Sequence, residues 1–404
     1  MNRPQHFADA EYLLDGFAHV ETSDEFRARL RLGRPLNVKL GIDPTSPDLH
    51  LGFMVVLHAL QRFAESGHAV TLIIGDFTAR IGDPSGKKVT RPQLTGDEIE
   101  ANMQTYRQQA SSVLDLERIT IRYNSEWLGA LSVEELVTLA GKTTVAQMLE
   151  RNDFRDRYES GDPISLHELL YPVAMAYDSI VVKADVELGG VDQLFNLLMG
   201  RHYQRELGQP PQICAMVPLL VGLDGVQKMS KSLGNYVGVT EPAQTQFGKL
   251  MSLPDALIPT YARYAAFRSE ADVQQLQADL QNDRLSPMEA KKRITQEIVA
   301  RYHGIEAAKA AGEYFERTVQ RKEFPDDAPE SIVDTSTPLI SSVLVASGLA
   351  ASKREAERLI KGGGVRIDGA VIRDPNAEWQ WWAEPVRVSI GARRFARVNA
   401  RLSP

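Results

Sequence analysis

Cysteine is nearly absent from this 404-residue chain, which contains only Cys214. A single cysteine excludes an internal disulfide and a zinc site built from several thiolates. Long hydrophobic runs are missing too, because no stretch of about 18 apolar residues occurs that could span a membrane. The first residues, MNRPQHFADAEYLLDGF, lack the basic start and apolar core of a secretory signal. We therefore expect a cytoplasmic protein with no membrane contact.

Net positive charge is also lacking. Lys and Arg number 46 against 53 Asp and Glu, and the net charge of −7 argues against a surface coated for nucleic acid. The charge is unevenly distributed, however. Residues 338–404 contain 11 basic and 6 acidic residues, a local charge of +5 that leaves −12 on the rest, together with three of the four tryptophans. This small basic segment favours a polyanion-binding appendage, with a solvated surface around a tryptophan core as the alternative.

Strand-like and helix-like segments alternate over residues 1–225. Strand candidates lie at residues 37–42, 69–74, 181–186 and 213–221, and an apolar stretch with helical spacing covers residues 51–63. This alternation predicts an α/β fold with a Rossmann-like open parallel sheet and right-handed crossovers. Ligands of such sheets bind at the carboxyl ends of the strands. The loops that follow strands are therefore the candidate site.

Composition divides the chain into four expected parts. Residues 1–242 form the catalytic domain, interrupted at about 93–165 by a charged and mostly helical insertion. Residues 243–323 form a helical domain, and residues 324–337, rich in Pro and Asp, form a linker. Residues 338–404 form the small basic domain.

The first candidate motif, DPTSPDLHLGF, follows the first strand at residues 43–53. Asp48 is expected to cap the helix that begins here, and the free N–H groups of a helix N-terminus accept phosphate. His50 lies in the first turn, and Gly52 would let a flat ring or the backbone approach closely. A histidine near a helix start is usually structural, so this motif alone does not decide the function.

The second motif, GDPSGKKVTR, covers residues 82–91 and superficially resembles a P-loop. Only three residues separate Gly82 from Gly86, and Lys88 stands in the Ser/Thr position, so we reject the P-loop. A glycine-rich loop carrying Lys87 and Arg91 still suits a triphosphate tail, although such loops are more often simply solvated.

The third motif, GLDGVQKMSKSLGN, covers residues 222–235. Lys228 and Lys231 are three residues apart between serines and glycines. Such spacing is typical of a mobile clamp that follows a phosphate group as its charge develops.

Together, the His-x-Gly element and the KMSKS string about 180 residues downstream resemble the paired signatures of class I aminoacyl-tRNA synthetases. The strings GIDPTSPDLHLG, IGDPSGKKVTR, LLYPVAMAYDS, ADVELGGVDQLFN and KMSKSLGNY look like the bacterial tyrosyl-tRNA synthetase family over nearly the whole chain. The string SKREAERLIKGGGVRIDG is similar to a small RNA-binding module first seen in a ribosomal small-subunit protein. The resemblance therefore implies a small α+β RNA-binding domain at the C-terminus.

The resemblance implies ATP-dependent activation of L-tyrosine to tyrosyl-adenylate, with pyrophosphate released, and transfer of tyrosine to the 3′ end of tRNA(Tyr). It implies Mg²⁺ that arrives with ATP, no metal held by the protein, and a homodimer whose interface comes from the helical insertion.

The same resemblance assigns roles to individual residues. Those expected to act on the departing pyrophosphate are Thr45, His50, Lys87, Arg91, Lys228 and Lys231. Those expected to hold the rest of ATP are Asp43, Gly52, Gly190, Asp192, Met229, Ser230 and Ser232. Those expected around tyrosine are Lys39, Gly41, Asp83, Tyr171, Met175, Asp178 and Gln193, with Asp178 accepting the phenolic proton. Those expected to contact RNA are Lys353, Arg354, Arg358 and Lys361.

Four positions depart from the family pattern. Phe53 stands where the family has a second histidine, and Val191 where it usually has a small hydroxyl residue. Met175 replaces a glutamine that contacts the substrate amino group. Lys39 replaces a phenol-binding tyrosine of one branch, and is expected to donate to the substrate hydroxyl or to pair with Asp178. These departures leave open a paralogue that activates a tyrosine analogue, or an inhibitor-tolerant second copy. A catalytically weak RNA-binding protein is a further alternative, which the intact motifs disfavour.

Overall fold

The computed structural model describes residues 9–45, 47–85, 94–321, 323–325, 328–334, 339–380, 384–391 and 394–401. The chain forms two compact units, Met1–Glu241 with Ser252–Tyr302 and Pro242–Met251 with His303–Pro404. Within the described ranges, no helix is both long and apolar enough to cross a membrane.

A six-stranded sheet in the order β1-β6-β5-β2-β3-β4 forms the centre of the first unit. The strands are β1 (His19–Glu21), β2 (Asn37–Ile42), β3 (Ala69–Ile74), β4 (Ile119–Tyr123), β5 (Val186–Gly190) and β6 (Ile213–Val217). Five of them run parallel, and the short edge strand β1 pairs antiparallel with β6. The Rossmann-like sheet expected from the sequence is therefore confirmed, with one antiparallel edge added.

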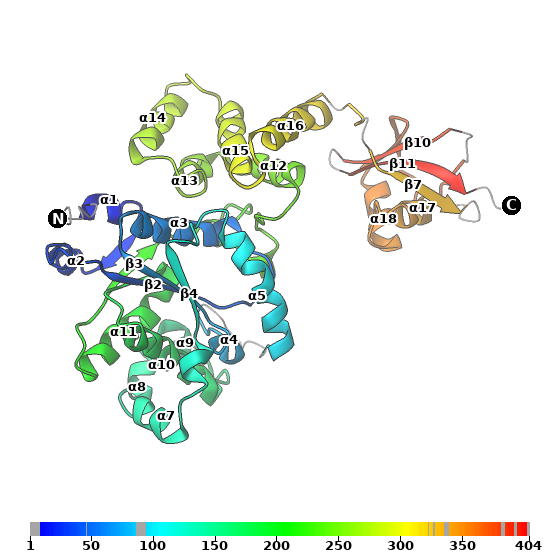
Figure 1. Cartoon of the computed structure of the whole chain (residues 1–404). Coiled ribbons are helices and arrows are strands. Elements are labelled where there is room, and N and C mark those ends of the chain that lie inside the picture. Colours follow the sequence, from blue (N-terminus) through cyan, green and yellow to red (C-terminus); the bar gives the residue numbers. More distant parts are fainter. Residues whose placement is uncertain are drawn as a thin grey trace. The chain divides into compact units, whose positions relative to one another are not determined.

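Helices cover both faces of this sheet (Figure 1). One side carries α3 (Leu51–Glu65) and α5 (Gly96–Ala110), and the other carries α10 (Leu166–Val181) and α11 (Leu194–Glu206). Buried apolar residues such as Leu40, Leu72 and Leu188 lie in the central strands, as expected for strands covered on both faces. Shorter helices complete this part of the unit: α1 (Ala10–Leu14), α2 (Ser23–Leu30), α4 (Thr78–Ile81), α6 (Ser125–Leu128), α7 (Val133–Ala140), α8 (Val145–Met148) and α9 (Asn152–Ser160).

The structure differs from four of the expected segments. The strand expected at 181–186 is the end of α10 followed by β5, which begins at Val186, and β6 ends at Val217 rather than Val221. The insertion expected at 93–165 is mostly helical, as predicted, but it also contains β4, which pairs with β3 and extends the central sheet. The linker expected at 324–337 contains β7 (Glu330–Asp334), a strand of the C-terminal sheet. Local periodicity did not indicate β4 or β7 because each has mixed polar and apolar residues at a sheet edge.

The expected helical domain is shared between the two units. The helices α13 (Ile258–Tyr264), α14 (Glu270–Gln281) and nearly all of α15 (Pro287–His303) belong to the first unit. The second unit contains α12 (Ala243–Met251) and α16 (Ile305–Phe315), which pack together, with Phe247 against Phe315.

The C-terminal part of the second unit is a small α+β fold. Its five-stranded sheet has the order β7-β11-β10-β8-β9, with β8 (Val365–Ile367), β9 (Ala370–Ile372), β10 (Val386–Ile390) and β11 (Arg394–Arg401). The helices α17 (Ile340–Ala346) and α18 (Lys353–Lys361) pack on it around Val343, Ile360, Val388 and Trp379. Trp381 and Trp382 lie outside the described residues.

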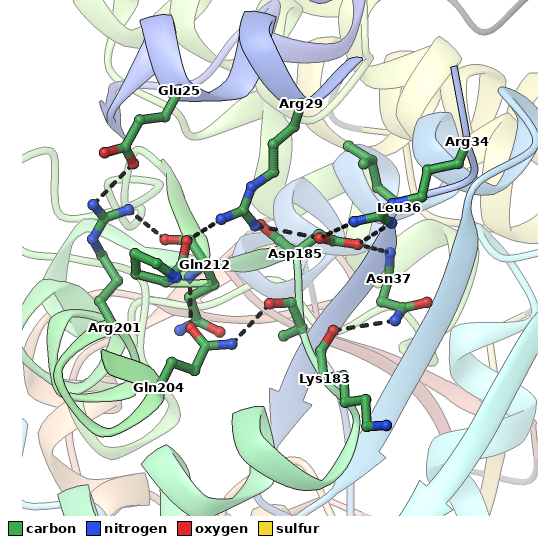
Figure 2. Close-up of polar contacts among 12 residues, drawn as sticks. Glu25, Arg29, Arg34, Leu36, Asn37, Lys183, Asp185, Arg201, Gln204 and Gln212 are labelled. Carbon is green, nitrogen blue, oxygen red and sulfur yellow. Dashed lines mark hydrogen bonds and ion pairs between the residues drawn. The ribbon is translucent and has the colours of Figure 1, made fainter. Parts of the chain in front are cut away.

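A polar cluster fixes the amino ends of β2 and β5, at the edge opposite to the expected site (Figure 2). The carboxylate of Asp185 accepts two hydrogen bonds from Arg34, at 2.7 and 2.8 Å, and one from the Asn37 N–H at 2.9 Å. Arg29 lies 3.4 Å from the same carboxylate. Burial raises the pKa of Asp185, but these hydrogen bonds and positive charges outweigh it and hold the pKa below its usual value.

We predict that Asp185→Asn lowers the free energy of unfolding by about 3 kcal/mol at pH 7, because it leaves the largely buried Arg29 without its counter-charge. Because the folded-state pKa is lowered, the carboxylate stabilises the fold above its unfolded pKa, and this contribution is lost as the pH falls through the folded pKa. Urea denaturation should therefore show a difference in the free energy of unfolding between wild type and Asp185→Asn that becomes smaller at acidic pH. Asp24→Asn, which removes an exposed ion pair with Arg27, is the control and should cost less than about 0.5 kcal/mol. A difference that persists unchanged into strong acid would contradict the assignment.

Candidate active site

Asp43 is the first site residue that the sheet positions, because it directly follows β2. Its Oδ2 accepts a hydrogen bond from the Tyr171 hydroxyl at 2.9 Å, and its Oδ1 accepts one from Thr78 Oγ1 at 2.7 Å. A Cβ on Gly75 would lie 2.0 Å from Asp43 Oδ1, so only glycine fits beside this carboxylate. Asp43 and Tyr171 were both expected in the site, and the structure brings them into direct contact.

Asp178 is the second positioned carboxylate, and only 3% of it is exposed. Its Oδ1 accepts a hydrogen bond from Trp127 Nε1 at 2.8 Å, and its Oδ2 accepts one from Asn124 Nδ2 at 3.3 Å. Asn124 also donates to Thr78 Oγ1 at 3.0 Å, which links Asp178 to the Asp43 cluster. Burial raises the pKa of Asp178 to about 6, against the opposing effects of the Lys39 charge and the two hydrogen bonds.

Lys39 does not lie where the sequence suggested. Its side chain is 1% exposed, and its Nζ lies 2.9 Å from Glu187 Oε1 and donates to the Met175 carbonyl at 3.2 Å. It is therefore buried beneath the site, and its partner is Glu187 rather than Asp178 or a substrate hydroxyl. Gly41, two residues further along β2, has open space, because a Cβ there would meet nothing within 4 Å.

A second polar cluster joins Asp83 to Gln193. Gln193 Nε2 donates to Asp83 Oδ2 at 2.9 Å and to Ser85 Oγ at 3.1 Å. The buried Arg151 donates to Ser85 Oγ at 2.6 Å and to Asn196 Oδ1 at 3.0 Å. Asp83 and Gln193 were expected on the substrate's amino-acid end, and they are neighbours here. Sequence analysis assigned no role to Ser85, Arg151 or Asn196, although Ser85 lies in the second motif and Asn196 ends the string ADVELGGVDQLFN.

His50 caps α3, in place of the expected Asp48. Its Nδ1 accepts a hydrogen bond from the Gly52 N–H at 3.2 Å, and its ring lies 4.7 Å from that of Phe53 between centroids. Burial, aided by the charge of Lys231, lowers the pKa of His50 to about 4. The imidazole is therefore neutral at pH 7, with Nδ1 as acceptor and Nε2 as donor.

The lysine-containing loop lies against this helix start. His50 and Gly238 form an isolated β-bridge. Next to it, the Leu51 N–H donates a hydrogen bond to the Val237 carbonyl at 3.0 Å. Lys231 Nζ donates to the Asp48 carbonyl, and burial lowers its pKa against the opposing charge of Asp48. The motifs at residues 43–53 and 228–232, expected to cooperate, are therefore adjacent.

Lys228 lies beside the remaining nucleotide candidates. Its Nζ contacts Asp192 Oδ2 at 2.7 Å, in an ion pair that is partly exposed. A Cβ on Gly190 would lie 2.8 Å from Asp192 Oδ1, so a larger residue here would displace the Asp192 carboxylate. Ser230 and Ser232 share a hydrogen bond of 2.9 Å, and Met229 is buried.

Two of the residues that depart from the family pattern pack against other side chains, and a third is exposed. The ring of Phe53 packs on His50, and Met175 packs against the cluster of Leu197, Cys214 and Met216. Val191 is exposed at the start of the 3₁₀ turn η1 (Val191–Gln193). Thr45 is half-buried next to Pro44, and its N–H donates to the Asp43 carbonyl at 2.8 Å. Lys87 and Arg91 lie outside the described residues.

The basic residues expected to contact RNA are on one helix of the second unit. Lys353, Arg354, Arg358 and Lys361 are all on α18, and all four are exposed. The buried face of α18 consists of Ala356 and Ile360. The four cations therefore form a free basic surface on a small α+β fold.

Comparison with known families and proteins agrees with this arrangement. Residues 31–320 match the family described as tRNA synthetases class I (W and Y), and residues 340–378 match the S4 domain. A tyrosine–tRNA ligase from Moorella thermoacetica is 49% identical over 95% of this chain and 94% of its own length. One from Aquifex aeolicus is 46% identical over 95% and 96%. A Vibrio parahaemolyticus protein named tyrosine–tRNA ligase 2 is 44% identical over 96% and 97%.

Solved structures share the fold. A tyrosyl-tRNA synthetase from Archaeoglobus fulgidus, solved with L-tyrosine, has a TM-score of 0.61 at 21% identity and covers 75% of this chain and 98% of that one. A truncated mitochondrial enzyme from Coccidioides posadasii has a TM-score of 0.61 at 20% identity, covering 75% and 90%. The family model covers most of this chain, and the tyrosine–tRNA ligases are 46–49% identical to it over nearly their whole length. This chain therefore belongs to the tyrosine–tRNA ligase family of class I tRNA synthetases.

Proposed function

We propose that this protein activates L-tyrosine with ATP to form tyrosyl-adenylate and pyrophosphate, and then transfers tyrosine to the 3′ end of tRNA(Tyr). The observation that carries the proposal is Asp178, a buried carboxylate whose two oxygens are already oriented by Trp127 and Asn124. A phenol can donate to this carboxylate, whereas a phenyl ring leaves it without that donor, so phenylalanine is rejected. The relatives, all tyrosine–tRNA ligases, favour this role over an analogue-activating paralogue or a weak RNA-binding protein. Because the substrate is tRNA, the proposed location is the cytoplasm.

The substrate's amino-acid end fits the clusters around the pocket. The open space over Gly41 suits the flat tyrosine ring, and Tyr171 and Asp83 can accept hydrogen bonds from the α-ammonium group. Gln193, held by its contact with Asp83, is placed for the carboxylate side. Met175 contributes only apolar contact, so ammonium recognition depends on the remaining oxygen acceptors.

The nucleotide end fits the two adjacent motifs. Gly52 and Gly190 allow the nucleoside to approach the backbone, and Asp192 suits the ribose hydroxyls, while Asp43 suits the substrate amine and the adenylate. Ser230 and Ser232 are proposed to line ATP from the loop, with the buried Met229 supporting them from beneath. Neutral His50 donates through Nε2 to the β- and γ-phosphates together with Thr45. Mg²⁺ would arrive bound to the phosphate oxygens of ATP, and no step depends on a protein ligand to it.

The reaction needs positioned charge rather than covalent catalysis. The tyrosine carboxylate attacks the α-phosphorus, the bond to the bridging oxygen breaks, and pyrophosphate leaves with the developing negative charge. Lys228 must exchange Asp192 for phosphate, and Lys231 must exchange the Asp48 carbonyl, so both ammonium groups follow the charge as it moves. Lys87 and Arg91 are proposed to reach the same group from the second loop.

We predict that pyrophosphate exchange into ATP depends on L-tyrosine and falls by about 100-fold or more in Lys231→Ala, because a cation that meets the transition-state charge is lost. Lys309→Ala, an exposed lysine on α16, is the matched control and should keep wild-type exchange. If no amino acid supports pyrophosphate exchange, the proposed reaction is refuted. Wild-type exchange in Lys231→Ala would remove the role of this lysine.

The second step requires tRNA, and the exposed cations of α18 are proposed to contact its phosphates. We predict that Lys353→Glu/Arg358→Glu raises the KM for tRNA in aminoacylation by about 10-fold or more at low salt. Pyrophosphate exchange by the same variant should be unchanged, because α18 is not part of the adenylate site. Arg284→Glu/Lys309→Glu reverses two exposed cations elsewhere and serves as control. Equal KM values in both double variants would exclude α18 from RNA binding.

We further propose a homodimer that forms through the helices α7 to α10. These helices share a small core around Phe154, yet they expose large apolar side chains. The exposed apolar residues on them are Val133, Val137, Val145, Tyr158 and Leu166. A group of such side chains on one set of helices is typical of an interface.

Sedimentation velocity should show a wild-type dimer that dissociates to monomer in Leu166→Glu, because a charge would be buried at the interface. Ile305→Glu, at an equally exposed apolar side chain on α16, should remain a dimer. A monomeric wild type would refute this proposal.

A further inference from the structure

A fully buried ion pair lies beneath the pocket and has no part in the reaction proposed above. Lys39 on β2 and Glu187 on β5 are direct partners in the parallel sheet, and their Nζ and Oε1 atoms are 2.9 Å apart. Each side chain is 1% exposed. Such a pair can often be replaced by apolar residues without loss of stability, so stability alone does not explain it.

The pair is connected to both sides of Asp178 on α10. Lys39 Nζ donates to the Met175 carbonyl at 3.2 Å, nearly one helical turn before Asp178. Glu187 Oε2 accepts a hydrogen bond from Ser179 Oγ at 3.2 Å, directly after Asp178, and another from Gln212. The contacts hold this stretch of α10 against β2 and β5. They therefore hold the Asp178 carboxylate at a fixed position relative to Gly41 on β2, which has open space beside it.

The pair also supplies the charges that act on Asp178. The positive charge of Lys39 favours the ionised carboxylate, and the negative charge of Glu187 opposes it. The side chains that donate hydrogen bonds to Asp178, Asn124 and Trp127, are neutral. An ionised Asp178 has acceptor capacity left for a phenol after these two hydrogen bonds. A protonated Asp178 would use part of that capacity for its own proton.

We propose that Lys39 and Glu187 are positioning residues that hold Asp178 in place and in its ionised form, and so determine the preference for a phenol over a phenyl ring. The inference deepens the proposed tyrosine specificity and rests on it. The pair acts through Asp178 and does not touch the substrate. The charge of Lys39 favours the ionised form of Asp178, and the charge of Glu187 opposes it. Replacing each residue should therefore have opposite effects on Asp178, which a purely structural role would not produce.

The test measures kcat/KM for tyrosine in pyrophosphate exchange between pH 5 and 8, for Lys39→Met, Glu187→Gln and the double variant. Lys39→Met should move the acid limb to higher pH, and Glu187→Gln should move it to lower pH, each by about one unit or more. The midpoint of the double variant should lie between those of the single variants. For a shift of about one pH unit, the ratio of kcat/KM for tyrosine over phenylalanine should fall about 2-fold at pH 7 in Lys39→Met, and about 9-fold at pH 5, because the ionised fraction of Asp178 falls by these factors.

Glu168→Gln is the matched control, because Glu168 on α10 forms another buried ion pair, with Arg157 at 2.7 Å. It should lower stability without moving the acid limb. If Lys39→Met does not fold, the downward shift in Glu187→Gln still decides the question. Loss of kcat/KM in both single variants with no shift of the acid limb would overturn the inference. A wild type without tyrosine-dependent exchange would instead refute the proposed function.

Discussion

An ionised carboxylate buried away from water costs several kcal/mol unless its surroundings replace the lost hydration. Asp178 is such a group, and two parts of the chain supply what it needs. Trp127 and Asn124 donate hydrogen bonds from the segment after β4, and Lys39 contributes charge from β2. These segments meet only because β4 and β2 flank β3 in the same parallel sheet. The surroundings of Asp178 in the candidate site therefore depend on the strand order as much as on the residues themselves.

The remaining site follows from the same edge of the sheet. Asp43 leaves β2 and is held by Tyr171 of α10, so one helix positions both pocket carboxylates. On the other side, the residues next to His50 pair with residues 237–239, which keeps the lysine-containing loop beside the start of α3. Lys228 forms a partly exposed ion pair with Asp192, and Lys231 donates to the Asp48 carbonyl. The proposed reaction requires both lysines to leave these partners when phosphate binds.

Sequence alone predicted the parts that rest on local pattern. The strands at residues 37–42 and 69–74 match β2 and β3 at both ends, because each is a compact β-biased run bounded by turn or loop residues. The cap of α3 was wrong, because Asp48 is a good capping residue by type while His50 has the required place and backbone geometry. The sequence did not predict β4, because the polar residues of this edge strand obscure the regular pattern of apolar residues. Asn124 and Trp127, which follow β4, were therefore not predicted either.

The Lys39–Glu187 pair could not be predicted for a different reason. It depends on which strands are neighbours and in what register, and a parallel sheet does not reveal this in local sequence. The roles of Lys87 and Arg91 remain predictions from the resemblance. The motifs therefore predict the chemistry of the site, whereas the sheet determines which side chains lie beside the predicted residues.

The ionised state of Asp178 is the central claim, and equilibrium binding of L-tyrosine to the wild-type protein as a function of pH tests it most directly. The pKa of about 6 predicts a nearly constant Kd above pH 7 and a rise of about tenfold per pH unit well below pH 6, as the carboxylate takes up its proton. L-Phenylalanine should bind weakly throughout, without this dependence. A Kd for tyrosine that stays constant from pH 8 to pH 5, or equal binding of the two amino acids, would contradict the account.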